Sequence, residues 1–261
     1  MPPSISLVAI DTDPDSWPLT RHAVEKSLAG IKVDDVLFFG QKPLGLGEQF
    51  IRIERFPSLG AYSEFVLKCL WPFIATDFAL TVHWDGFVVN PEQWSEKFLE
   101  FDYVGAPWCP DGDIAGLTQV QSAAGAIAHE YLVGNGGFSL RSRELINLCS
   151  NPYLRRHPEL PFGTAEDVVI CRIYRKQLEQ KGLRFAPIEL AKQFSYETGV
   201  LSERPFGFHG PLNMLIFMPE DELLELAKPL IAKLVGRGEA FADFKFACEH
   251  RGYDRLLASL P

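Results

Sequence analysis

Short apolar runs alternate along the chain with segments whose apolar residues recur at helical spacing. The runs have the length and composition of buried strands, and they occupy residues 4–10, 33–39, 50–53 and 78–84. The segments at residues 18–28 and 61–71 each place their apolar positions on one helix face. Strands that alternate with helices of this length predict an α/β fold, a three-layer Rossmann-like sandwich around a mostly parallel central sheet.

The pattern changes after Phe101. A helix is predicted over residues 91–101, and residues 102–136 are rich in glycine and proline and are expected to form loops on the functional face. Further predicted elements are strands at 137–140 and 184–187, and helices at 143–149, 165–180, 220–235 and 241–259, the last interrupted at Gly252. We expect a single domain over residues 1–261, with residues 210–261 as its C-terminal helical part.

Composition narrows the class of protein. Of 261 residues, 47% are hydrophobic and 23% charged, and the net charge is −9, so nucleic acid is excluded as a partner because the basic residues are scattered and form no basic face. No apolar stretch has the roughly 18 residues that a membrane span needs, and the N-terminal residues resemble a first core strand rather than a signal peptide. The cysteines number five and are widely spaced, which fits a reducing cytosol and predicts a cytoplasmic protein.

One acidic residue occupies a favourable place for chemistry. Asp85 follows the apolar run 78–84, with His83 before it and Gly86 after it to let the backbone turn. In open α/β sheets ligands bind beyond the carboxyl ends of the strands, where a divalent cation can bridge an acid and a nucleotide diphosphate. A solvated turn aspartate is the alternative for this tripeptide alone.

Three later segments carry further candidates. Gly134, Gly136 and Gly137 precede a strand and permit close approach of a ligand to the backbone, although a tight turn would have the same composition. The adjacent acids Glu166 and Asp167 open a helix, where they suit either a general base or a pairing with the helix dipole. Histidine 209 lies between glycines within the sequence FGFHG and is free to meet a metal, or is structural.

Taken in order, these segments resemble the GT-A fold of nucleotide-sugar-dependent glycosyltransferases, and more closely a GT-A-like family described by the domain of unknown function 5672. The matching segments are LVAIDT, VLFFG, AYSEFVLKCL, HWDGFVVNPEQW, FDYVGAPW, VGNGGFSLRSR, EDVVICR, RFAPIELAKQFSYE and FGFHG. The resemblance implies transfer of a sugar from a nucleoside diphosphate sugar to the hydroxyl of a carbohydrate or other acceptor, with inversion and with Mn²⁺ or Mg²⁺. Surface polysaccharide synthesis is the setting that analogy suggests.

The resemblance also implies roles for individual residues. Asp11 and Thr12 would meet the base and ribose, and Gly136 and Gly137 would line the donor sugar. Asp85 resembles the surviving acid of the metal-binding Asp-x-Asp signature, and His209 the late histidine that completes the metal site. His83 stands where that signature has its first Asp, which leaves one carboxylate for a hard cation instead of two.

Two further expectations concern helix starts. Glu166 or Asp167 resembles the xED acid that acts as general base in inverting members, and we favour Asp167 as the cleft-facing base with Glu166 as the brace, because adjacent helix positions point about 100° apart. Tyr62 and Ser63 begin a helix that leads toward Asp85, so we expect them near the nucleotide.

Alternative functions remain open on the sequence. Asp11-Thr12-Asp13 follows a strand like the nucleophile and general acid of haloacid-dehalogenase-like phosphohydrolases, although Asp15 stands where that signature has a hydroxyl residue. The string Asp111-Gly112-Asp113 lies in a proline- and glycine-rich loop and is interpreted as a turn. A non-catalytic carbohydrate-binding protein is favoured if the side chains of Asp85 and His209 point apart.

Overall fold

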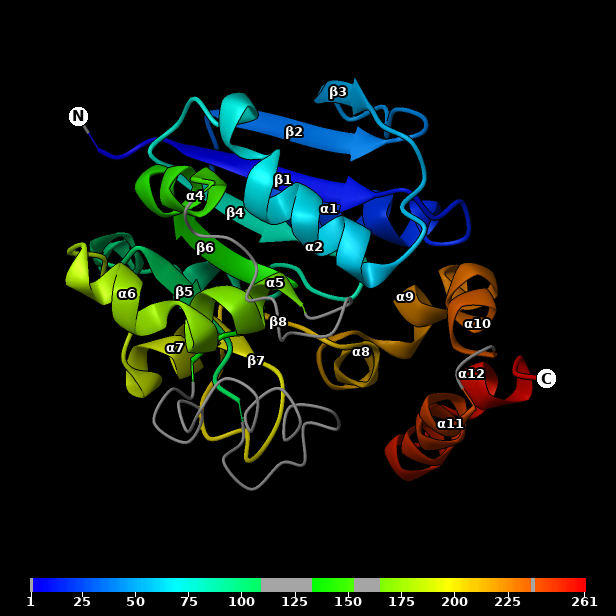
Figure 1. Ribbon diagram of the computed structural model, residues 1–261. Helices are drawn as coiled ribbons and strands as arrows, with labels where there is room; N and C mark the ends of the chain where they lie inside the picture. The colour runs from blue at the N-terminus through cyan, green and yellow to red at the C-terminus, as the bar shows by residue number, and fades with distance from the viewer. Residues whose placement is uncertain (1, 109–132, 153–164, 236–237) are drawn as a thin grey trace.

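A mixed sheet forms the centre of the computed structural model, which describes residues 2–108, 133–152, 165–235 and 238–261. The sheet has six strands in the order β3-β2-β1-β4-β6-β5. Their bounds are β1 Ile5–Asp11, β2 Asp35–Gly40, β3 Gln49–Arg52, β4 Phe78–Val82, β5 Tyr103–Gly105 and β6 Phe138–Ser142. Only β6 runs against the others among these strands. The predicted α/β fold with a mostly parallel sheet is confirmed (Figure 1).

The two central strands are buried on both faces, as their uninterrupted apolar sequences predict. Strand β1 pairs in parallel with β4, with Ala9 opposite Val82, and with β2 on its other side. Because these strands share direction and register, the residues that follow β1 and β4 emerge at the same edge of the sheet. That edge carries Asp11 from β1 and His83 and Asp85 from the turn after β4.

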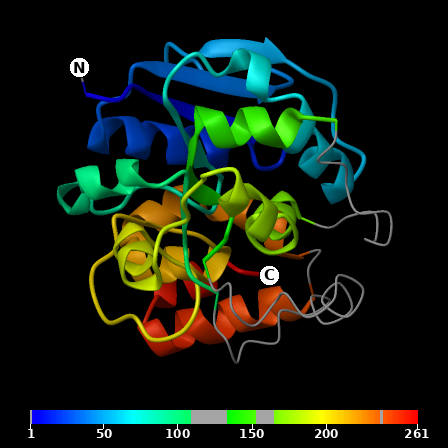
Figure 2. The same cartoon turned by 60° about the vertical axis from the view of Figure 1, so that its left-hand side comes forward.

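Helices cover both faces of the sheet, which completes the predicted three layers. Helix α1 (Trp17–Gly30) packs on one face, in a core that it shares with the C-terminal helices. Helices α2 (Leu59–Lys68) and α4 (Arg143–Ser150) contribute to the core on the other face. The C-terminal helices are α8 Pro211–Phe217, α9 Glu220–Glu225, α10 Ala227–Val235, α11 Glu239–Arg251 and α12 Asp254–Ala258. Helices α11 and α12 lie on the opposite side of the molecule from β3 (Figures 1 and 2).

Three predicted elements differ from the structure. Residues 91–101 form two 3₁₀ turns, η2 (Pro91–Gln93) and η3 (Glu96–Glu100), rather than one helix, because Ser95 is extended and its hydroxyl caps the second turn. The helix predicted from residue 165 is divided into α5 (Glu166–Val168), the π-helical η4 (Val169–Ile173) and α6 (Arg175–Gln180). Residues 184–187 make only an isolated bridge, between Phe185 and Tyr103.

Other segments were assigned incompletely by the sequence pattern. Strand β5 lies in the stretch expected to be loops, and α7 (Ile188–Phe194), α8 and the short parallel pair β7 (Ser195–Tyr196) and β8 (Gly207–Phe208) were not expected. The interruption predicted at Gly252 is confirmed, since this residue ends α11 with φ 69°. No helix in the described part of the chain is long and apolar enough to cross a membrane.

Candidate functional site

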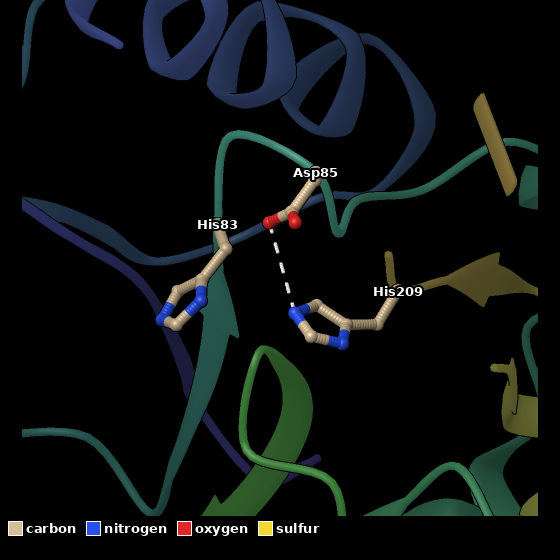
Figure 3. Close-up of side chains that lie close together, drawn as sticks. All are labelled: His83, Asp85 and His209. Atoms are coloured by element: carbon tan, nitrogen blue, oxygen red, sulfur yellow. Dashed lines mark ion pairs between the residues drawn. The ribbon is translucent and has the colours of Figure 1, made fainter. Parts of the chain in front are cut away.

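Two histidines and one aspartate meet at the carboxyl edge of the sheet. His83 and Asp85 lie in the turn after β4, where Gly86 pairs back with His83, and His209 follows β8. The backbone N–H of Gly210 donates to the carbonyl of Asp85 at 2.7 Å, which ties the two segments together. His209 Nε2 lies 3.7 Å from Asp85 Oδ1 (Figure 3). The predicted approach of these two side chains is therefore confirmed.

Glycines make room for the His209 ring. A Cβ added at Gly137 would lie 2.1 Å from His209 Nε2 and Cδ2, and one added at Gly86 would lie 2.9 Å from Cδ2. Real Cβ atoms do not approach other atoms so closely, so the ring can occupy this position only because both residues lack side chains. In the structure the glycine before β6 thus makes room for a side chain of the protein itself, whereas the sequence suggested close approach of a ligand.

Each histidine is held by a partner on the nitrogen that faces away from the cluster. The Tyr62 hydroxyl lies 2.7 Å from His83 Nε2. His209 Nδ1 lies 3.2 Å from Glu197 Oε1 and 2.8 Å from the Asn135 amide nitrogen, and that amide donates to Glu197 Oε1 at 2.6 Å. Partners of this kind orient histidines that ligate metals.

The two rings differ in charge. Burial, followed by the nearby His209, lowers the pKa of His83 to about 4, so this imidazole is neutral near pH 7. Burial also acts to lower the pKa of His209, but the carboxylates of Asp85 and Glu197 outweigh it and raise the pKa to about 9. Near pH 7 the His209 ring therefore carries a proton on both nitrogens, and Nε2 must release its proton before it can bind a cation.

The donor set fits a divalent transition metal. One ligand atom from each of His83, Asp85 and His209 can be chosen so that all lie within 4.8 Å of one another. Imidazole nitrogens suit transition metals, whereas Mg²⁺ prefers oxygen ligands. The cluster therefore fits Mn²⁺ better than Mg²⁺, and the site would still need ligands from outside the cluster to complete an octahedral shell.

A cavity of about 330 Å³ lies beside the cluster, at the carboxyl ends of β1 and β4. Asp11, Thr12 and Tyr62 line it together with His83, as expected for the nucleotide side of the site. Ser63 does not belong to this lining: it lies one turn inside α2, which begins at Leu59 with Ser58 as its N-cap, and its hydroxyl is buried. Ser58 lines the cavity instead.

The carboxylate of Asp11 is committed to its own loop. Its Oδ1 accepts from the Asp13 N–H at 2.9 Å and from the Ser16 hydroxyl at 2.8 Å, and its Oδ2 accepts from the Thr20 hydroxyl. Burial raises the pKa of Asp11, and these hydrogen bonds oppose the shift. Asp11 therefore shapes the cavity wall at the end of β1.

A lysine from the C-terminal part of the chain reaches the same cavity. Lys233 on α10 lies 2.6 Å from the Asp13 carboxylate and its side chain is only 13% exposed. Burial acts to raise the pKa of Asp13, but the hydrogen bond and charge of Lys233, the Asp15 N–H and the charge of Arg55 together outweigh it and lower the pKa. No sequence motif marked Lys233, because 220 residues separate it from Asp13.

The two members of the acid pair have different surroundings. Glu166 is 3% exposed and pairs with Arg141 on β6, at 2.9 Å. Asp167 accepts the Gly136 N–H at 2.7 Å through Oδ2 and the Val168 N–H at 2.7 Å through Oδ1. Burial and the charge of Glu166 raise the pKa of Asp167 to about 6. The arrangement suits a base that titrates near neutral pH.

Sequence reasoning missed several residues of this site. Asn135, Glu197, Arg141 and Lys233 hold its side chains in place. The first three lie in segments that match the family but were given no role, and Lys233 lies outside all of these segments. Only Asn135 gave a signal, since an asparagine next to glycines often adopts the left-handed conformation and this one has φ 27°. The string Asp111-Gly112-Asp113 lies outside the described residues.

A family profile described as "Protein of unknown function (DUF5672)" matches residues 47–209. The chain belongs to this family. The DUF5672 match includes the metal-type cluster, the glycine-rich segment and the acid pair, whereas Asp11, Asp13 and Lys233 lie outside it. No curated protein matches the sequence.

Solved glycosyltransferases share part of the fold. Glucosyl-3-phosphoglycerate synthase from Mycobacterium tuberculosis, in complex with Mn²⁺ and uridine-diphosphate-glucose, aligns with TM-score 0.45 and 15% identity over 70% of this chain and 68% of that one. A glycosyltransferase involved in the glycosylation of the major capsid of PBCV-1 aligns with TM-score 0.44 and 13% identity, over 79% and 92%. A mycobacterial protein aligns with TM-score 0.40 and 13% identity over 55% of this chain and 54% of its own length, so the chain spans about half of it.

Proposed function

We propose that this protein is a glycosyltransferase that moves a sugar from a nucleoside diphosphate sugar to an acceptor hydroxyl. The observation that carries the proposal is the cluster of His83, Asp85 and His209 beside a polar cavity at the carboxyl edge of the sheet. A nucleoside diphosphate needs a cavity for its nucleoside and a cation for its phosphates, and here the two adjoin through His83, which belongs to both.

The nucleoside would occupy the cavity at the ends of β1 and β4. The cavity walls offer aromatic rings from Phe56, Tyr62 and Trp84 and the polar pair of Asp13 and Lys233. Aromatic rings bind the faces of bases, and a carboxylate and an ammonium together can accept from and donate to ribose hydroxyls. Asp11 and Thr12 would set the shape of this part of the site.

The diphosphate would lie toward His83, Asp85 and His209. A bound divalent cation there would supply positive charge to the leaving group as it departs. The chain's own part is to hold the ligands in place, through Tyr62 on His83 and through Glu197 on His209. Two imidazoles in the set favour Mn²⁺ over Mg²⁺.

Asp167 would act as the general base. Its carboxylate is fixed by backbone N–H groups of Gly136 and Val168 at 2.7 Å each, beside the glycines that would line the donor sugar. A base at this place would take the proton of the acceptor hydroxyl as that oxygen attacks the sugar, which is the role expected in an inverting transfer. Glu166 would hold the helix start through its pairing with Arg141.

Thermal shift with nucleotides and metals tests the donor side. UDP, GDP, ADP or dTDP, each added with Mn²⁺, should raise the melting temperature for at least one base. A ligand at a hundredfold excess over its Kd stabilises by about 2.7 kcal/mol, which corresponds to roughly 5–10 °C in a protein of this size. The increase should be smaller with Mg²⁺ than with Mn²⁺.

Substitution of the cluster provides the control. Asp85→Asn and His209→Ala should abolish the additional stabilisation that Mn²⁺ gives to the nucleotide complex, whereas Asp243→Asn, an exposed position on α11, should retain it. If no nucleoside diphosphate raises the melting temperature with or without metal, the protein does not use such donors.

Two other functions are supported less well by the geometry. A phosphohydrolase needs a free carboxylate oxygen on its nucleophile, whereas Oδ1 of Asp11 accepts from Asp13 and Ser16 and its Oδ2 accepts from Thr20 on α1. The sequence favoured non-catalytic carbohydrate binding only if the side chains of Asp85 and His209 pointed apart. His209 Nε2 and Asp85 Oδ1 instead lie 3.7 Å from one another. Release of phosphate from a sugar phosphate would favour the phosphohydrolase.

A further inference from the structure

A second cavity, of about 410 Å³, shares no lining residue with the nucleotide cavity at the ends of β1 and β4. Its walls come from the residues after β5, from the first turns of α7, and from β7 with the loop that follows it. Its lining residues are Pro107, Trp108, Ile188, Glu189, Lys192 and 195–203. This volume lies within the range of small-molecule sites.

The cavity joins the proposed active site through one carboxylate. Glu197 lines the cavity, and its Oε1 lies 3.2 Å from Nδ1 of His209, the ring that faces Asp85. The nucleotide cavity reaches the same cluster through His83. The two cavities therefore contact the cluster through different residues. Two separate binding places beside one cluster are what a donor and an acceptor need for transfer between them.

Polar atoms in the second cavity's wall lack partners. Ser195 is fully buried, and its hydroxyl has no hydrogen-bond partner among the described residues. Glu197 Oε2 is likewise buried without a partner in that part of the chain. Buried polar atoms are nearly always hydrogen-bonded in native proteins. Ser195 has no exposed surface, whereas the Glu197 side chain is 20% exposed, so Glu197 is the residue that a hydroxyl of a ligand can reach.

The charge of the lining selects against anions. It contains the carboxylates of Glu189, Glu197 and Glu203. Lys192 pairs with Glu189 at 3.1 Å and the protonated His209 pairs with Glu197 at 3.2 Å, so among the described residues Glu203 is the lining carboxylate left without a cation. A phosphate or carboxylate in this cavity would face that negative charge. A neutral ligand meets no such penalty.

Apolar side chains occupy the rim. Val200 is 90% exposed and Leu201 42% exposed, and Ile188 and Tyr196 continue the apolar surface inward. A free sugar would leave this surface in water, whereas a sugar joined to an apolar group would cover it.

From these observations we infer that the second cavity binds the acceptor, and that the acceptor is an uncharged glycoside with an apolar aglycone. This inference rests on the proposed function, because only a transferase has an acceptor. Hydroxyls of the sugar would bond Glu197, and the aglycone would lie against Val200 and Leu201 at the rim.

Binding of matched probes by calorimetry or ligand-observed NMR tests this inference without any transfer. Phenyl β-D-glucoside should bind at least about tenfold more tightly than glucose, because its ring covers apolar surface. It should also bind at least about tenfold more tightly than phenyl β-D-glucuronide, which carries a negative charge. Glu203→Lys should reduce the difference in affinity between the glucoside and the glucuronide, because it should improve the binding of the glucuronide alone.

Filling the cavity gives the matched control. Ile188→Trp should abolish glucoside binding, and Gln193→Trp, at an exposed position of the same helix outside the lining, should leave it unchanged. Both variants should keep the stabilisation by nucleotide and Mn²⁺.

The outcomes separate this inference from the proposed function. Three results would each overturn the assignment of the cavity, even if nucleotides bind. They are glucoside binding that is retained in Ile188→Trp, glucuronide binding as tight as glucoside binding, and no binding of any probe. If the glucoside binds as described but no nucleotide does, the cavity's ligand class stands and the donor side of the proposal fails.

Discussion

The two sides of the site are assembled differently. On the nucleotide side, Asp11, His83 and Asp85 follow directly on two neighbouring parallel strands, so sheet register alone brings them together. On the β6 side, the contacts join segments far apart in the chain: Asn135 with Glu197 across 62 residues, and Asn135 with His209 across 74.

This difference indicates what each side depends on. The nucleotide side should tolerate changes in distant loops, because β1 and β4 fix it through backbone pairing. The β6 side depends on buried polar contacts and on glycines that admit a ring, and such contacts are costly when one member is removed. Three substitutions, all on the β6 side, test this contrast.

Asp167→Asn should have the largest effect. Removal of a general base lowers turnover by about 10²–10⁴. The Asn amide can accept from only one of the two backbone N–H groups that Asp167 holds, so the variant should also melt at a lower temperature, but nucleotide with Mn²⁺ should raise its melting temperature by as much as that of the wild type. Since a base acts in its ionised form and the pKa of Asp167 is raised to about 6, wild-type turnover should fall as the pH drops below about 6.

The pH profile distinguishes a base from a structural residue. The fall in turnover at low pH, which is the acidic limb of the profile, should be absent from the residual activity of Asp167→Asn. Glu166→Gln removes the neighbouring charge that helps raise the pKa of Asp167, so the limb should move to lower pH. Full activity in Asp167→Asn, or a limb that does not move in Glu166→Gln, would contradict the assignment.

Arg141→Met should have the next largest effect, on stability. Arg141 and Glu166 form an ion pair whose side chains are 2% and 4% exposed, with N···O 2.9 Å. Removal of one partner from a buried pair costs about 3–5 kcal/mol, because the remaining charge is left unpaired. Urea unfolding measures the loss, and Arg141→Met/Glu166→Leu should recover part of it.

An exposed ion pair serves as the control. Arg255 also pairs with its partner Glu220 at 2.9 Å, but its side chain is 62% exposed, so Arg255→Met should shift the unfolding midpoint far less. Equal losses in the two variants would show that burial of the Arg141 pair does not matter. The pair would then not account for the position of Asp167.

Sequence patterns predicted the positions of those site residues that lie at the ends of strands and helices. The positions of Asp11 and Asp85 at strand ends and the helix start at Glu166 follow from local periodicity, and they lie where expected. The partners of His209 and Glu166 could not be predicted, because Glu197 and Arg141 meet them only after the chain has packed. The placement of Ser63 differed for a local reason: α2 begins at Leu59, two residues before the predicted start.

Gly137→Ala should cost less stability than Arg141→Met, but its effect should be specific. The added methyl would lie 2.1 Å from the His209 ring, so the ring must move away from Asp85. Overpacking of this kind costs about 1–3 kcal/mol, and displacement of His209 should remove the stabilisation by Mn²⁺ in a thermal-shift assay. If the clash with the ring is the cause, Gly137→Ala should destabilise His209→Ala less than it destabilises the wild type. Additive losses in this double-mutant cycle would mean that Gly137 is needed for its backbone rather than for the ring, and the β6 side would then resemble the nucleotide side after all.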